Sequence, residues 1–228
     1  MQLIFDLLKD SGKALSGRSR ADRVFTIFWL MGPFFLLIER SPGDIWLSVL
    51  ALAFVLRSFY LRDFVCLERF WVRTAFFFWG VCIISAALSS NAIYALGETF
   101  SWIRFPLFAM ATVFWLGTDK RLLRLMLSLV ALAFLLMCLI LTAEIIFEGF
   151  KDRLSWPYGD LVPGNYLAKA GMPAITTAAA LAVTQSGTRA KTGLMFVVIG
   201  LIFVFLTGER INSLILLCGA LLSALIVS

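Results

Sequence analysis

The sequence predicts an all-α, polytopic transmembrane helix bundle with about eight helices and a cytoplasmic N-terminus. Three observations support this prediction. Of the 228 residues, 61% are hydrophobic, whereas a soluble domain contains about 45–50% apolar residues. Long apolar runs alternate with short connectors that carry charged and turn-forming residues. Finally, Lys and Arg concentrate in alternate connectors, as they do in the cytoplasmic loops of membrane proteins.

Eight apolar runs define the expected helices. The first contains Gly32-Pro33 and is expected to kink, because membrane helices tolerate proline. The following motif ERSPGD, at 39–44, is rich in helix-breaking residues and predicts a tight turn. The fifth run is long enough to cross the membrane at a tilt. The runs cover residues 24–38, 45–61, 72–88, 102–116, 122–147, 174–183, 194–206 and 213–228.

The basic residues set the expected orientation. Residues 1–23 are polar and basic, and predict a cytoplasmic segment that forms either a short interfacial helix or a partly ordered tail. No cleavable signal peptide is expected, because no small-residue cleavage site follows the first apolar run. With the N-terminus inside, the cytoplasmic connectors carry 13 Lys and Arg residues against 5 outside. The transmembrane domain then covers 24–228, with an extracytoplasmic loop at 148–173.

Composition narrows the chemistry. The chain has no histidine, which removes the commonest general base and metal ligand. Its four cysteines are scattered without a CxxC pair, so neither a disulfide nor a thiolate metal site is expected. The net charge of +6 is attributed to the basic cytoplasmic loops, and no nucleic-acid partner is expected. We expect no metal or other cofactor, and the partner is the lipid bilayer.

Polar side chains on the predicted outer face form the candidate site. Two arginines, Arg104 and Arg210, fall at the expected membrane boundary, where they could grip a phosphate headgroup bidentately. This requires their side chains to lie within about 10–12 Å of each other. Arg104 fits equally well as an interfacial anchor beside Trp102. The candidate residues are Arg104, Arg153, Asp160, Asn165, Tyr166, Lys169, Glu209 and Arg210.

Two motifs contain most of these residues, and each has a structural and a functional interpretation. The segment PYGDLVPGNYLAK, at 157–169, either begins a helix whose N–H groups face an anion or forms a rigid loop without a ligand. Glu209 and Arg210 do not face each other on a helix. They either mark the membrane boundary, or Arg210 faces a cavity while Glu209 meets another cation, such as Lys169 or Arg104.

The segments RLSWPYGDLVPGNYLAKAGMPA (153–174), FLTGERINSLILLCGALLSA (205–224) and WIRFPLFAMA (102–111) resemble the O-antigen ligase superfamily, which includes O-antigen polymerases. The resemblance implies metal-independent glycosyl transfer at the periplasmic face of the bacterial inner membrane. The donor would be an undecaprenyl-diphosphate-linked glycan. The acceptor would be lipid A–core for a ligase, or another lipid-linked repeat for a polymerase.

The resemblance also suggests residue roles. The family has an arginine after a Thr-Gly pair at the outer end of a helix, which matches Arg210, and its implied role is to bind the donor diphosphate. Arg104 would share that task, with Lys169 and Arg153 as looser candidates. Family members have more helices, and the ligases have a required histidine in a later periplasmic loop. The absence of histidine here predicts an N-terminal part that does not catalyse transfer alone, or a divergent, inactive relative.

Two other functional classes fit a chain of this composition. A small permease or flippase-like carrier should show internal repeats and broken helices that meet near the midplane. The sequence shows no repeat, and its charges fall near the predicted outer edge. An accessory membrane subunit would need no cluster of cations on one face. The glycosyltransferase hypothesis is therefore preferred.

Overall fold

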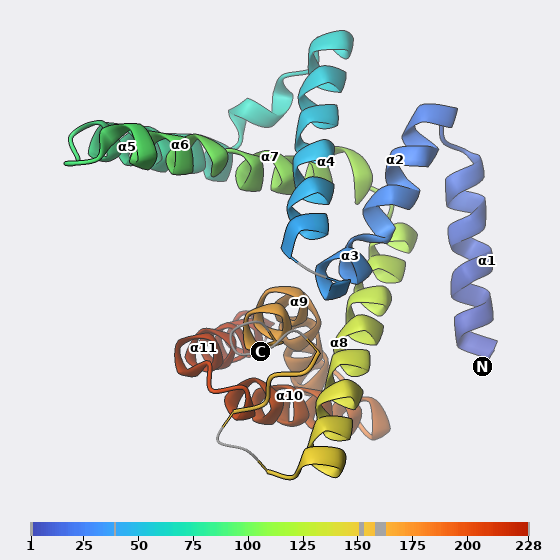
Figure 1. Ribbon diagram of the computed structural model, residues 1–228. Coiled ribbons are helices and arrows are strands. Elements are labelled where there is room, and N and C mark those ends of the chain that lie inside the picture. Colours follow the sequence, from blue (N-terminus) through green and yellow to red (C-terminus); the bar gives the residue numbers. More distant parts are fainter. Residues whose placement is uncertain (1, 39, 151–152, 158–162, 228) are drawn as a thin grey trace. The chain divides into compact units, whose positions relative to one another are not determined.

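Every regular element that the structure describes is helical (Figure 1). This computed structural model describes residues 2–38, 40–150, 153–157 and 163–227, and within these ranges the predicted all-α class is confirmed. The chain divides into two compact units. The first comprises Met1–Gly32 and Arg40–Leu125, and the second comprises Pro33–Glu39 and Met126–Ser228. The predicted division into a cytoplasmic segment, 1–23, and a transmembrane domain, 24–228, depends on where the membrane lies and stays a prediction.

The first unit is built around two helix pairs. Within it, α4 packs against α7 and α5 packs against α6, while α2 contacts both α4 and the π-helical turn η2. Helix α8 (Lys120–Glu148) begins in this unit and continues into the second. The other elements are α1 (Gln2–Ser16), α2 (Arg20–Leu30), α4 (Arg40–Leu61), the 3₁₀ turn η1 (Val65–Glu68), α5 (Phe70–Ala87), α6 (Ala92–Ser101), α7 (Arg104–Ala111) and η2 (Thr112–Leu116).

Asp22 joins three elements of the first unit. Its Oδ1 accepts a hydrogen bond of 2.7 Å from Nε1 of Trp115 in η2 and lies 3.4 Å from Nε of Arg57 in α4. The Arg57 guanidinium also lies over the Trp115 ring, 5.3 Å from its centroid. One turn away, Arg18 donates a hydrogen bond of 3.0 Å to the carbonyl of Leu116. Polar contacts therefore hold α2 against α4 and η2.

The kink predicted at Gly32-Pro33 is a break between two helices. Helix α2 ends at Leu30 and α3 (Gly32–Ile38) begins two residues later. A Cβ atom on Gly32 would overlap the indole of Trp46, whose Nε1 donates a hydrogen bond of 2.9 Å to the carbonyl of Phe28. Glycine at this position therefore lets α4 approach the end of α2.

The tight turn predicted for ERSPGD is wrong. Helix α4 begins at Arg40, so residues 40–44 form its first turn. A proline is tolerated there, because the first N–H groups of a helix have no intrahelical partner. The connector expected at 89–101 likewise contains helix α6. Its presence lengthens the fourth apolar segment to Ala92–Leu116.

The second unit packs α10 and α11 against α9, and buried residues of α8 join the same hydrophobic core. It contains α3, most of α8, α9 (Pro163–Thr184), α10 (Thr188–Leu206) and α11 (Arg210–Val227). The buried ring of Phe134 in α8 packs against Gly171 of α9 and Gly200 of α10. A Cβ atom on either glycine would meet this ring. Small residues thus allow the close helix contacts typical of membrane proteins.

Six helices in the described ranges are long and apolar enough to cross a membrane. The apolar stretch Gly171–Thr184 is shorter, and neither α2 nor α3 reaches the length of a span. The chain is therefore a multi-pass helical membrane protein. The full number of spans and the orientation stay predictions. The six candidate spans are Ser41–Leu61, Phe70–Ala87, Ala92–Leu116, Lys120–Glu148, Thr188–Leu206 and Arg210–Val227.

Candidate functional site

Arg153 fastens the segment after α8 to the turn between α10 and α11. Its Nε donates a hydrogen bond of 2.6 Å to the Thr207 carbonyl, and its Nη2 donates one of 2.8 Å to Oε1 of Glu209. The backbone N–H of Leu154 adds a bond of 3.2 Å to the carbonyl of Leu206. The two charged side chains are 37% and 20% exposed. The pair is thus partly protected from water. An ion pair in such a position contributes more to stability than one at a fully exposed surface.

Gly208 has two structural reasons to be glycine. Its φ of +77° lies in the left-handed region, which other residues rarely adopt. The Arg153 side chain also packs against it, so a Cβ atom on Gly208 would lie only 3.0 Å from Arg153 Nε. The preceding Thr207 is buried, and its hydroxyl donates to the carbonyl of Val204. The Thr-Gly pair therefore forms the surface on which Arg153 lies.

Glu209 meets a cation, as one of the two sequence interpretations predicted, and that cation is Arg153. Its second carboxylate oxygen accepts a hydrogen bond of 3.3 Å from Nδ2 of Asn212. Its backbone carbonyl accepts bonds from the N–H and the hydroxyl of Ser213 in α11. The Glu209 side chain is thus held in place by neighbouring residues of the second unit.

Arg210, the next residue, has a different environment. Its side chain is exposed and contributes to a cavity of about 510 Å³ between α10 and α11. The guanidinium has no hydrogen-bond or ion-pair partner among the residues that the structure describes. Apart from Ser213 the other lining residues are apolar: Leu201, Ile202, Phe205, Leu206, Leu214 and Leu217. A cation beside an apolar groove suits a ligand with an anionic head and a hydrocarbon tail.

A second carboxylate, Glu144 near the end of α8, also holds the segment that contains Arg153. Glu144 is fully buried and accepts hydrogen bonds from the backbone N–H groups of Ser155 at 3.0 Å and Trp156 at 2.9 Å. The Ser155 hydroxyl adds a bond of 3.2 Å. The sequence pattern alone does not predict this role for Glu144. The available signal was a carboxylate inside an apolar run, which calls for partners.

The remaining sequence candidates in the second unit have varied surroundings. Helix α9 begins at Pro163, so the interpretation in which PYGDLVPGNYLAK begins a helix holds for its residues 163–169, while an anion at its N–H groups stays a prediction. Tyr166 is buried in the core of the unit rather than exposed on its surface. Asn165 and Lys169 belong to α9, but their side chains lie outside what the structure describes. Asp160 lies outside the described residues altogether.

Arg104 belongs to the first unit and is engaged there. Its Nη2 lies 3.1 Å from Oδ1 of Asp44, which joins α7 to α4. The guanidinium also lies 5.3 Å from the centroid of the Phe105 ring. Because α6 precedes it, Arg104 falls near the middle of the candidate span Ala92–Leu116 rather than near its outer end. Arg104 and Arg210 belong to different units, so their predicted closeness stays a prediction.

These elements define a multi-pass helical membrane protein whose second unit presents an exposed arginine beside an apolar groove. No protein-family model, curated protein or solved structure matches the chain. The class of protein therefore rests on the helices themselves, and the particular function is a proposal.

Proposed function

We propose that this chain forms the donor-binding part of an O-antigen-ligase-type glycosyltransferase of the bacterial inner membrane. The enzyme would transfer a glycan from undecaprenyl diphosphate to lipid A–core at the periplasmic face. One observation carries the proposal: Arg210, which follows Thr207-Gly208-Glu209, has no partner among the described residues and lines an apolar groove. An isoprenoid tail with a diphosphate head combines the two chemistries that this groove offers.

Arg210 would act on the donor's leaving group. When the bond between sugar and diphosphate breaks, negative charge develops on the diphosphate oxygens, and a guanidinium already in place stabilises that charge. Glu209 would hold the turn rather than act as a base, because its carboxylate is occupied by Arg153 and Asn212. The general base is not assigned to a residue of this chain.

Donor binding can be measured directly. The purified chain in detergent micelles is titrated with undecaprenyl diphosphate, and bound lipid is quantified by native mass spectrometry. Loss of the bidentate contact should lower affinity at least tenfold in Arg210→Ala, with Arg210→Lys in between because a lysine offers only a point charge. Arg20→Ala, which removes an exposed arginine of the first unit, is the matched control and should bind normally. Equal binding by wild type and Arg210→Ala would refute the assignment.

A cellular experiment separates the functional classes. Arg210→Ala is placed in the gene that encodes the chain in its own bacterium, and surface polysaccharide is examined by gel electrophoresis. Loss of all polymer on lipid A–core indicates a ligase, whereas core carrying a single repeat indicates the alternative, a polymerase. Unchanged polysaccharide, with the variant inserted normally, would contradict both and favour a carrier or an accessory subunit.

A further inference from the structure

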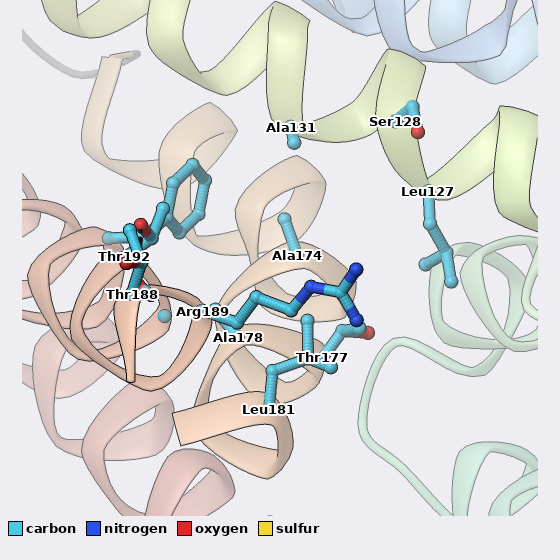
Figure 2. A pocket seen from close by; sticks show the side chains of 12 residues that line it. Leu127, Ser128, Ala131, Ala174, Thr177, Ala178, Leu181, Thr188, Arg189 and Thr192 are labelled. Atoms are coloured by element: carbon cyan, nitrogen blue, oxygen red, sulfur yellow. Dashed lines mark hydrogen bonds between the residues drawn. The ribbon is translucent and has the colours of Figure 1, made fainter. Parts of the chain in front are cut away.

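A second cavity lies within the same unit, between α8, α9 and α10 (Figure 2). It has a volume of about 410 Å³, within the range of about 300–1,000 Å³ found for small-molecule sites. Small residues line it on all three helices: Ala131 on α8, Ala174 and Ala178 on α9, and Gly193 on α10. A Cβ on Gly193 would lie 2.6 Å from the Ala178 carbonyl oxygen. Helices α9 and α10 thus touch at Gly193. Beside this contact, the short side chains of the lining leave the space open.

Among the described residues that line this cavity, Arg189 is the one that carries a charge. Figure 2 shows its side chain extending from α10 across the cavity towards Ala174 and Thr177 of α9. Arg189 is exposed, and its guanidinium has no hydrogen-bond or ion-pair partner among the described residues. Its donors are thus available to an anion, and no carboxylate among the lining residues competes for them.

Two of the lining hydroxyl groups, those of Thr177 and Thr192, already donate their protons within their own helices. Thr177 donates its hydroxyl proton to the carbonyl of Pro173 at 2.6 Å. Thr192 donates likewise to the carbonyl of Thr188 at 2.9 Å. Both hydroxyls therefore offer acceptor lone pairs and little donor capacity to a ligand. An anionic oxygen, which needs donors, would gain little from these two hydroxyls, and Arg189 offers the one charged donor among the described lining residues.

We propose that this cavity binds an anionic phospholipid, with its phosphate on Arg189 and part of one acyl chain against the apolar wall. Leu127, Leu181 and Phe196 complete that wall, and such a surface gives a hydrated inorganic anion nothing to bind. Basic pockets between membrane helices commonly bind such headgroups on the cytoplasmic side, which is the side that the charge distribution predicts for residues 184–193.

This lipid site is distinct from the groove beside Arg210. Arg189 lies in the first turn of α10, and Arg210 follows the other end of that helix. At about 1.5 Å per residue, the 19 residues of α10 separate the two ends by about 28 Å. This is close to the roughly 30 Å of a bilayer's hydrocarbon core. With α10 spanning the bilayer, the two arginines lie in opposite leaflets, and the phospholipid proposal does not depend on the proposed glycosyltransferase function.

The test compares two phospholipids that share their acyl chains, one with an anionic and one with a zwitterionic headgroup. The purified chain is titrated with dioleoyl phosphatidylglycerol or dioleoyl phosphatidylcholine in mixed micelles, and retained lipid is counted by native mass spectrometry. Wild type should prefer phosphatidylglycerol by about five- to tenfold, as expected for one arginine at a charged headgroup. Arg189→Ala should abolish the preference, while Arg189→Lys should keep part of it. Arg20→Ala, which removes an exposed arginine of the first unit, should keep the whole preference.

Two further arms address the acyl chain and the source of the anion. Ala131 is half-buried, so Ala131→Leu should extend into the cavity and weaken binding of both lipids without altering the charge. Inorganic phosphate at millimolar concentration should not displace phosphatidylglycerol. The proposal is overturned if Arg189→Ala keeps the preference, if Arg20→Ala loses as much of it, or if inorganic phosphate competes. Circular dichroism and the elution volume verify that each variant is folded.

Discussion

Nη2 of Arg153 lies 2.8 Å from a carboxylate oxygen of Glu209, and the two residues are 56 positions apart. This ion pair has two consequences. It binds the segment that follows α8 to the turn before α11, and it uses the carboxylate beside Arg210. Glu209 and Arg210 are neighbours in the sequence, but their surroundings differ. The Glu209 carboxylate is paired with Arg153, whereas the Arg210 side chain is exposed beside an apolar groove.

The Arg153–Glu209 pair should show energetic coupling. Arg153→Met and Glu209→Gln should each lower the free energy of unfolding by roughly 1–2 kcal/mol, a value reduced from that of buried charged hydrogen bonds because both groups are partly exposed. The double variant should lose little more than either single variant, because the interaction can be lost only once. Denaturation followed by circular dichroism in a mild detergent measures this cycle. Strictly additive losses would mean that the pair contributes nothing.

Glu144→Gln should loosen the segment that Arg153 begins. In the wild type the Glu144 carboxylate accepts hydrogen bonds from the N–H groups of Ser155 and Trp156. A glutamine keeps one acceptor oxygen but replaces the other with an NH₂ group, which cannot accept. The free energy of unfolding should fall by about 1–3 kcal/mol, because a buried N–H donor loses its acceptor. Hydrogen exchange at Ser155 and Trp156 should therefore accelerate at least several-fold.

Glu148→Gln supplies a matched control one turn further along α8. Glu148 is exposed and accepts a bond of 3.2 Å from the Trp156 indole, so its change should affect the backbone exchange much less. Equal acceleration in both variants would contradict a specific role for the buried carboxylate.

Stability should depend on pH through Asp22. Burial opposes its ionisation, but hydrogen bonds from Ser19 and Trp115 and the charge of Arg57 outweigh it and hold the pKa below its usual value. A lowered pKa in the folded state stabilises the protein above the unfolded pKa, about 3.9, and this contribution is lost as pH falls through the folded pKa.

The corresponding variant is Asp22→Asn. Its stability deficit relative to wild type should be complete at pH 6–7 and should shrink below about pH 4. Thermal unfolding of both proteins, monitored by tryptophan fluorescence in detergent across this range, measures the difference. A deficit that stays constant down to pH 3, or grows there, would exclude this role for the carboxylate.

Local pattern predicted most of the fold because membrane insertion depends on local hydrophobicity. A helix must satisfy its own backbone in lipid, so a long apolar run indicates a helix without knowledge of its neighbours. The runs that became α4, α5, α8, α10 and α11 were located in this way. The predicted turn at ERSPGD is wrong because helix-breaking residues do not interrupt a helix when they lie in its first turn. Proline and glycine are acceptable in the first turn, where Arg40 begins α4.

The sequence by itself thus determined that this is a helical membrane protein and which residues carry charge among apolar runs. Only the tertiary structure decided the partners of those charges: Arg153 for Glu209, Asp44 for Arg104, and the amides of Ser155 and Trp156 for Glu144. The physical reason is that hydrophobicity accumulates along a single segment, whereas a charge is neutralised by whichever group packing brings within about 3 Å. Packing also left Arg189 and Arg210 exposed beside apolar cavities.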